Sequence, residues 1–329
     1  MTWGNSAFEV DEFFYCSELS KPVLVREVRV KNLQERPTSV LAKTGCLGYF
    51  VKKRIALKAG EERRVFFQYT LDVPKKRVRL FLKPKIKIQS SVLRYWENTA
   101  EVISDSPLLN HYFFASRSQL PAVISKSERV DGSIWQYKRE WVRDQAMLAV
   151  GLTLSGQHRT ARVILQRLLS EFITDEGQSI DSSEIRHHDE VELDQNGVLL
   201  HALKHYVLWT GDLDLIKENW EKIRATAGFP LRHVFSHLPS GLLANTREYW
   251  ERHRAFGIQK GMELAHQLFV SVGLADAALL SRLIGREKEG LHWEAEAHRL
   301  KQAFLTDLRY SLVEEGRFIK RRYVDGAVQ

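Results

Sequence analysis

The chain has 329 residues, of which 44% are hydrophobic and 27% charged, so it is not a disordered or low-complexity chain. A length of this order suggests about two domains. The two cysteines, Cys16 and Cys46, are too few for a disulfide framework, and we expect both side chains to be buried. The formal net charge of +8 is the unusual value in the composition.

This charge is concentrated in one segment. Residues 21–95 contain 20 Lys and Arg but five Asp and Glu, whereas the rest of the chain is mildly acidic. Such asymmetry raises the question of polyanion binding, but no RNA-binding signature and no interleaved aromatics accompany the basic residues. We therefore expect a solvated sheet face and no nucleic-acid partner. No apolar run approaches the length of a membrane helix and no signal peptide is evident, so we expect no membrane partner and a cytoplasmic location.

The basic segment has the alternating pattern of β-strands. Hydrophobic residues alternate at positions 65–73, at 78–88 with a break at Pro84, and around 28–31. The basic side chains of the second run share the opposite face, and they are Arg77, Arg79, Lys83, Lys85 and Lys87. The pattern predicts an antiparallel, sandwich-like β-domain over residues 1–95, possibly incomplete.

Helical patterns follow from about residue 105. The spacing of apolar residues predicts helices over 158–173, 198–209 and 215–227. Glycines at 156, 211 and 273 are predicted to end long helices, each just before a new helical pattern near 158, 213 and 275. We expect a linker with a helix over 96–130, then an array of three helical hairpins over 131–329.

Three polar motifs lie between the predicted helices. In the first, Arg143 and Asp144 can hydrogen-bond vicinal sugar hydroxyls while Trp141 stacks on a sugar ring. The same two charged residues are also consistent with a capping ion pair at a helix start. In the second motif, residues 192–197, Asp194 is either a ligand or a helix cap.

The third motif, residues 247–254, contains Glu248, Trp250, Glu251 and Arg252. A carboxylate beside an indole loses hydration, which raises its pKa as a general acid requires. The alternative is a solvated carboxylate paired with a neighbouring arginine.

The histidines do not predict a metal site. His201 and His205 are one helical turn apart, but the Glu that follows the first His in a zinc-protease helix is missing. His187, His188 and Asp189 form a local cluster that is only suggestive. We expect no metal and no organic cofactor.

Taken in order, the three motifs resemble those of glucoamylase-type enzymes, glycoside hydrolase family 15. The resemblance lies in W-x-R-D at 141–144, L-D-x-x-G at 193–197 and the acid-bearing segment at 249–252. It covers residues 95–325 by motif and residues 1–95 only in architecture. It implies a β-domain followed by an α/α toroid of six helical hairpins, of which about the first half corresponds to residues 131–329.

The resemblance also implies a function and site residues. The implied enzyme is an exo-acting glycosidase that releases terminal glucose from α-glucans or oligosaccharides with inversion, one carboxyl group protonating the glycosidic oxygen while another activates water. Glu251 is the implied general acid, and Glu248 is the fallback. The implied substrate-binding residues are Trp141, Arg143, Asp144, Asp194, Trp250 and Arg252.

The sequence departs from the family where the general base is expected. That residue lies in the last hairpins of the family, so we expect this chain to be a fragment that is inactive or very weak alone. Three alternatives remain open: an inverting disaccharide phosphorylase, a trehalase of similar architecture, and a noncatalytic scaffold that binds carbohydrate or polyanions.

Overall fold

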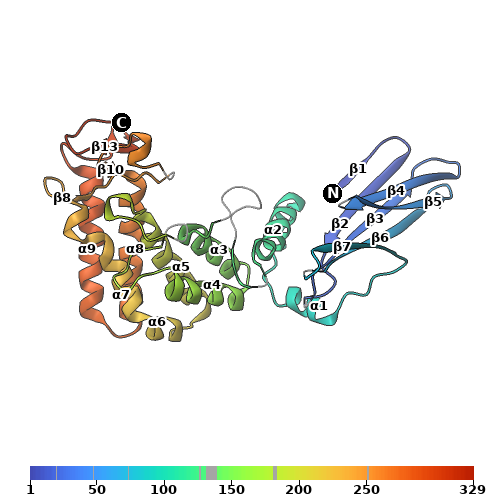
Figure 1. The fold of residues 1–329 in the computed structure, drawn as a ribbon, viewed down its shortest axis with the longest axis horizontal. Helices are drawn as coiled ribbons and strands as arrows, with labels where there is room; N and C mark the ends of the chain where they lie inside the picture. The colour runs from blue at the N-terminus through green and yellow to red at the C-terminus, as the bar shows by residue number, and fades with distance from the viewer. Residues whose placement is uncertain are drawn as a thin grey trace. The chain divides into compact units, whose positions relative to one another are not determined.

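The computed structural model of the chain describes residues 1–19, 21–46, 48–72, 74–125, 127–130, 139–180, 184–249 and 252–329. Their contacts divide them into two units, Met1–Thr99 and Ala100–Gln329. Figure 1 shows the long strands in the first unit and the long helices in the second. The boundary expected at residue 95 falls within helix α1 (Ser90–Glu97), which belongs to the first unit.

The first unit is built on an antiparallel sheet with the strand order β1-β2-β3-β6-β7. Neighbouring strands in this sheet are paired in antiparallel register, and β4 pairs with β5 as a separate hairpin. The strands are β1 (Thr2–Gly4), β2 (Phe8–Tyr15), β3 (Val23–Asn32), β4 (Thr38–Cys46), β5 (Tyr49–Leu57), β6 (Glu62–Asp72) and β7 (Arg77–Lys83).

A small apolar core joins the hairpin to the sheet. Ile55 and Leu57 of β5 belong to the same buried cluster as Val28 of β3 and Phe67 of β6. The alternation in β6 explains this packing, because every second side chain of a strand points to the same face. The predicted antiparallel β-region is therefore confirmed.

Two details of this unit differ from the sequence prediction. The strand predicted to continue past Pro84 ends at Lys83, because proline has no N–H for the ladder and restricts the residue before it. Cys16 is exposed, and Cys46 is only partly buried, so the prediction of two buried cysteines is wrong.

Three helical hairpins form the body of the second unit. They are α3 with α4, α5 with α6 and α7, and α8 with α9. The first helices of the three hairpins pack side by side, since α5 contacts both α3 and α8. The bounds are α3 (Val142–Leu154), α4 (His158–Glu171), α5 (Asp194–Thr210), α6 (Asp214–Glu218), α7 (Trp220–Gly228), α8 (Leu264–Leu283) and α9 (Glu287–Thr306), after an earlier helix α2 (Pro107–Gln119).

Glycine ends the first helices of the hairpins, but not always where the sequence suggested. Gly156 and Gly211 follow α3 and α5 with φ values of 78° and 71°, as a left-handed cap requires. The third turn is made by Gly285 at φ 79°, after α8. The prediction that Gly273 ends a helix is wrong, because Gly273 lies in the middle of α8.

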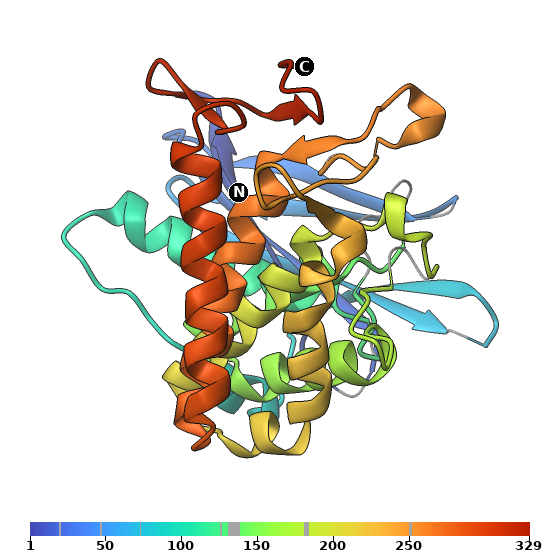
Figure 2. The same ribbon diagram turned by 90° about the vertical axis from the view of Figure 1, so that its left-hand side faces the viewer.

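Gly273 instead lets two helices approach closely. A Cβ at Gly273 would lie 2.5 Å from the Cα of Gly197 in α5, and a Cβ at Gly197 would lie 2.0 Å from the carbonyl oxygen of Phe269 in α8. Both distances are shorter than van der Waals contact, so only glycine fits at either position. Figures 1 and 2 both show α8 beside α9, which covers it on another side.

The helix predicted over 215–227 is interrupted. Asn219 separates α6 from α7, and its amide donates to the carbonyl of Leu215 while exchanging hydrogen bonds with Gln166 of α4. The loops carry short strands that pair as β8 with β9, β10 with β13 and β11 with β12. These strands are β8 (Ser236–His237), β9 (Leu242–Leu243), β10 (Gly261–Glu263), β11 (Val313–Glu314), β12 (Arg317–Phe318) and β13 (Arg321–Tyr323).

Helix α8 is long and apolar enough to cross a membrane, which the search for apolar runs in the sequence missed. More than half of its apolar stretch is buried within the helical unit, against α5 and α9. Packing in a protein core accounts for this composition, because a helix that is hydrophobic all round is buried in one environment or the other.

Candidate functional site

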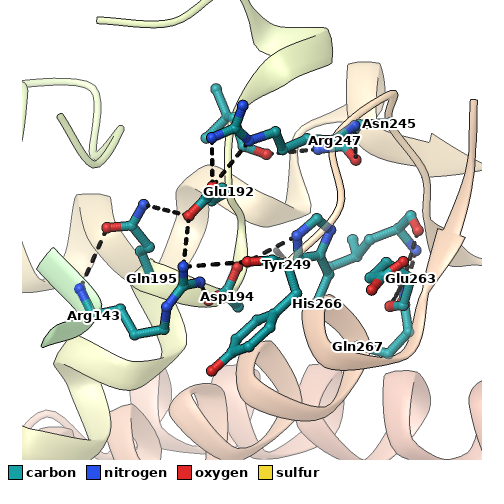
Figure 3. Close-up of polar contacts among 12 residues, drawn as sticks. Arg143, Glu192, Asp194, Gln195, Asn245, Arg247, Tyr249, Glu263, His266 and Gln267 are labelled. Atoms are coloured by element: carbon teal, nitrogen blue, oxygen red, sulfur yellow. Dashed lines mark hydrogen bonds and ion pairs between the residues drawn. The ribbon is translucent and has the colours of Figure 1, made fainter. Parts of the chain in front are cut away.

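The amino ends of α3, α5 and α8 meet in a cluster of charged side chains. Arg143 lies in the first turn of α3, Asp194 begins α5, and His266 lies in the first turn of α8. Figure 3 shows how these side chains converge with those of the loop before α8. The helices carry these groups to one end of the unit because the first helices of successive hairpins run in the same direction.

Arg143 is the central donor of the cluster. Its Nη1 lies 2.5 Å from Asp194 Oδ2, and its Nη2 lies 3.0 Å from Glu192 Oε2 and 3.3 Å from the carbonyl oxygen of Tyr249. The guanidinium also stacks on the ring of Tyr249 at 4.2 Å from the centroid. Although burial opposes the charged form, the carboxylates of Asp194 and Glu192 raise the pKa of Arg143, so the guanidinium stays charged.

Glu192 joins two arginines and a helix end. It is fully buried and accepts from Arg247 at 2.6 and 2.9 Å, in addition to Arg143. Gln195 donates to Glu192 at 3.1 Å and accepts from the backbone N–H groups at the start of α3. A glutamine from α5 thus takes the place of a local N-cap for α3, because Trp141, the residue before α3, has no side chain that can cap the helix.

Asp194 is held in the ionised form. It is fully buried, with Oδ1 lying 3.3 Å from Nε2 of His266 and Oδ2 facing Arg143. Burial on its own would raise the pKa of Asp194, but His266 and Arg143 outweigh it, and the pKa lies below its usual range. The positive charges of Arg143 and Arg247 balance the negative charges of Glu192 and Asp194.

A further buried arginine fixes the loop that precedes α8. Arg321 of β13 donates to the backbone carbonyls of Asn245 at 2.6 Å, Arg247 at 2.9 Å and Gln259 at 2.8 Å. Its Nη1 also lies 3.3 Å from Glu263. One side chain therefore holds both ends of the segment 245–259, which contains the third sequence motif.

Glu248 lies within that segment and is fully buried. It accepts from Lys320 Nζ at 3.0 Å and from the amide of Gln329 at 2.8 Å. These partners and the charge of Arg252 outweigh burial, so the pKa of Glu248 lies below its usual range. The backbone N–H of Glu248 also donates to the carbonyl of Arg252 at 2.8 Å, which closes the chain on itself across this motif.

The structure brings some of the sequence-predicted residues together. Arg143 and Asp194 are in direct contact, and Trp141 is buried immediately before α3. Asp144 is exposed on the first turn of α3, and partial desolvation raises its pKa against the opposing charge of Arg143. Arg252 has an exposed side chain, 54% accessible, at 3.8 Å from Glu248. The remaining two predicted residues, Trp250 and Glu251, lie outside the described residues.

Sequence reasoning did not predict several residues of the cluster. They are Glu192, Arg247, His266, Glu263 and Arg321. Glu192 and Arg247 each lie within a motif that drew attention, yet nothing local indicated that they pair with each other. The one available signal was the charged residues at 192, 194 and 247 flanking strongly apolar stretches, because buried charges require partners.

Among the described residues, one group of three neighbouring side chains has the composition of a metal site. His187, His188 and Asp189 place one ligand atom each within 4.8 Å of one another, and they are partly or fully exposed. They follow one another in sequence on the surface, and no further carboxylate or imidazole is grouped with them. This is the same cluster that the sequence indicated as only suggestive.

No family model matches the chain, and no curated protein matches it in sequence. Similar folds occur among solved structures. A family GH78 rhamnosidase of Bacillus sp. GL1 superposes with a TM-score of 0.52 at 15% identity, covering 93% of this chain and 34% of that one. A rhamnosidase from Klebsiella oxytoca with rhamnose bound has a TM-score of 0.52 at 14% identity, with coverages of 96% and 66%.

A bacterial glucoamylase complexed with acarbose also has a TM-score of 0.52, at 12% identity, with coverages of 95% and 58%. These structural neighbours are thus glycoside hydrolases, and at 12–15% identity the similarity shows a shared fold. The chain spans about one third to two thirds of the length of these proteins. The glucoamylase and the two rhamnosidases have the same TM-score, so the comparison does not favour one of these specificities over the other.

Proposed function

We propose that the helical unit binds and cleaves the terminal sugar of an oligosaccharide or α-glucan, as a glucoamylase-like exo-acting glycoside hydrolase. The observation that carries the proposal is the meeting of three motifs far apart in sequence. Arg143 contacts Asp194, 51 residues away, and the carbonyl of Tyr249, 106 residues away and adjacent to Trp250 and Glu251. Each motif is weak alone, but their convergence at one end of a glycosidase-like fold supports a common site.

In this site the buried charged side chains hold the backbone in position, and the exposed side chains bind the sugar. Arg143 already donates three of its five N–H groups to protein acceptors, so it holds the amino end of α3 in place. Asp144, next to it and exposed, is the acceptor for sugar hydroxyls, and Arg252 is an exposed donor. The charge balance of the buried cluster suits a neutral ligand.

Glu251 is the proposed general acid, on the basis of its motif. Glu248, the fallback, is less suited to the role, because Lys320 and Gln329 stabilise its ionised form while a general acid must carry a proton at the working pH. The anchoring of Arg247 by Arg321 and the bond from Glu248 to Arg252 fix the chain on both sides of Glu251. We propose inversion as the stereochemical outcome, with a general base not assigned to any described residue.

A rhamnosidase is a second candidate, because two rhamnosidases match the fold as well as the glucoamylase does. An inverting phosphorylase and a trehalase differ from the first proposal only in the acceptor or in the second sugar. Activity assays distinguish these alternatives. Phosphate-dependent release of a sugar phosphate identifies a phosphorylase, and selective cleavage of an α-rhamnoside identifies a rhamnosidase.

The test measures binding and turnover with the full chain. Maltose, acarbose, trehalose and rhamnose are titrated calorimetrically, and nitrophenyl α-glucoside and α-rhamnoside are assayed with and without inorganic phosphate. We expect Asp144→Asn to weaken sugar binding at least about tenfold, since it removes a charged hydrogen-bond acceptor. Glu251→Gln should preserve binding and lower any turnover by about 10²-fold or more.

Asp214→Asn is the matched control, because Asp214 is an exposed aspartate in the first turn of α6. It should leave sugar binding unchanged. Binding of no sugar by the wild-type chain at millimolar concentration, or equal binding by the Asp144→Asn variant, would contradict the proposed site. Unchanged turnover in the Glu251→Gln variant would remove Glu251 from the mechanism.

A further inference from the structure

Two imidazoles face each other on α5, away from the cluster described above. His201 and His205 are one helical turn apart, and their Nε2 atoms are 3.1 Å from each other. The rings are nearly perpendicular, with an interplanar angle of 78°. Both side chains are partly exposed, so a solute can reach the space between them.

The orientation of His201 is set by the next hairpin. Its Nδ1 lies 2.6 Å from Asp276 Oδ2 on α8, and a carboxylate at this distance accepts the Nδ1 proton. The Nε2 of a neutral His201 therefore carries a lone pair that points toward His205. A carboxylate bound to the far nitrogen is the usual arrangement behind a histidine that ligates a metal.

The contacts of His205 cannot all be hydrogen bonds. Its Nε2 lies 3.1 Å from His201 Nε2 and 3.5 Å from the ammonium group of Lys204. A ring nitrogen has either one proton or one lone pair, so it satisfies only one of these two neighbours. If His205 accepts from Lys204 while His201 is protonated on Nδ1 alone, two lone pairs face each other at 3.1 Å. If it donates to His201, its N–H faces the ammonium group.

We propose that His201 and His205 form a binding site for a divalent transition-metal ion, with Asp276 orienting the first ligand. Two metal–nitrogen bonds of about 2.05 Å spanning 3.1 Å enclose an angle of about 98°, which fits tetrahedral or octahedral coordination. The ion accepts both lone pairs, and Lys204 keeps its ion pair with Asp276 at 3.3 Å. Water completes the coordination from the exposed side.

The all-nitrogen ligand pair selects ions such as Zn²⁺, Ni²⁺ and Cu²⁺ over the oxygen-preferring Mg²⁺ and Ca²⁺. This site is distinct from the proposed sugar site, since His201 is seven residues from Asp194 on α5, about 10 Å along the helix axis. A bound ion links two turns of α5, and through Asp276 it stiffens the contact with α8.

The test titrates the untagged full chain with Zn²⁺ by calorimetry and follows thermal unfolding with and without the ion. We expect one site per chain, and a higher melting temperature with Zn²⁺, because the ion binds the folded state. His201→Ala and His205→Ala should each weaken binding at least tenfold, and Asp276→Asn about tenfold. In the 1:1 Cu²⁺ complex, paramagnetic resonance should show two coordinating imidazole nitrogens.

Two controls separate this site from other histidines. His298→Ala removes an exposed histidine on α9 and should leave Zn²⁺ affinity unchanged. The double variant His187→Gln, His188→Gln removes the surface cluster near residue 188 and should also retain the tight site. His205→Gln, which preserves size and polarity, keeps the test valid if the alanine variants unfold.

The proposal is overturned if wild-type protein binds Zn²⁺ no more tightly than the His201 and His205 variants. It is equally overturned if the tight site disappears in the His187 and His188 double variant. Neither result bears on the sugar-binding proposal, because sugar titrations are run without added metal.

Discussion

Removing the guanidinium of Arg143 is the most direct perturbation of the charged cluster. In the Arg143→Leu variant, Glu192 still has Arg247 at 2.6 and 2.9 Å, so its charge remains paired. Among the residues that the structure describes, the other charged neighbour of Asp194 is His266, at the longer distance of 3.3 Å. The cost of the substitution therefore arises mainly from one buried carboxylate that has lost its closest cation.

Breaking a buried ion pair by removing one partner costs about 3–5 kcal/mol, and the remaining His266 places this case near the lower end. A typical protein has a free energy of unfolding of about 5–15 kcal/mol, so the loss of this ion pair removes a large fraction of the stability. For a unit of this size, 3 kcal/mol corresponds to a fall of about 6–12 °C in melting temperature. Sugar binding should weaken as well, since the first turn of α3 loses its anchor.

The effect should depend on pH in a defined direction. In the wild type the pKa of Asp194 is lowered, so its stabilising contribution persists above the unfolded pKa of about 3.9 and disappears as the pH falls through the folded value. In the variant, burial dominates and raises the pKa of Asp194, which then takes up a proton in mildly acidic solution. The difference in unfolding free energy between wild type and variant should therefore shrink from pH 7 to pH 5.

Urea unfolding followed by circular dichroism at pH 5, 6 and 7 measures this difference, and calorimetry separates the transition of the helical unit from that of the β-unit. Arg282→Leu is the control, because Arg282 pairs with Glu294 at 2.5 Å on the surface, where solvent screens the charges. The reasoning is refuted if Arg143→Leu costs less than about 1 kcal/mol at pH 7, or if its cost is the same at pH 5.

Three further predictions concern the packing of each unit and the loop held by Arg321. Gly197→Ala should destabilise the helical unit by about 3 kcal/mol or more, because the new Cβ would collide with the backbone of α8. The control is Gly285→Ala, which has open space around it but a φ of 79°, and it should cost about 1–2 kcal/mol. Thermal unfolding compares the stabilities of the two variants. Phe67→Ala should cost the β-unit about 3–5 kcal/mol, and the exposed Phe50→Ala should cost far less in the same urea assay. Arg321→Lys should speed amide hydrogen exchange in residues 245–259, because an ammonium group cannot reach three carbonyls at once. If these amides exchange as slowly in the variant as in the wild type, Arg321 does not hold this loop.

The elements with a strong local signal were predictable from sequence. The apolar periodicity of residues 158–173 gave α4 to within two residues, and Gly156 and Gly211 end their helices with the left-handed geometry expected of them. Both features depend on interactions within one turn of the chain. The alternation at 65–73 predicted β6 for the same reason, because side chains on a strand have a period of two residues.

Gly273 shows where local reasoning fails. A glycine beside a helical pattern is consistent with a cap or with a close helix contact, and only the position of Gly197 on α5 distinguishes them. The same holds for Asp194, which local sequence favours as a cap. In the fold it is a buried ion bound to Arg143, 51 residues earlier.

The sequence by itself determined the order of a basic β-region and helical hairpins, and it contained three motifs that resemble those of a glycosidase family. Only the tertiary structure decided which charged residues pair, because the energy of a buried ion depends on the partners that other helices bring to it. Glu192 with Arg247, Arg321 with the carbonyls of the 245–259 loop, and His201 with Asp276 all join segments separated by more than 50 residues. No pattern within one helix or strand contains that information.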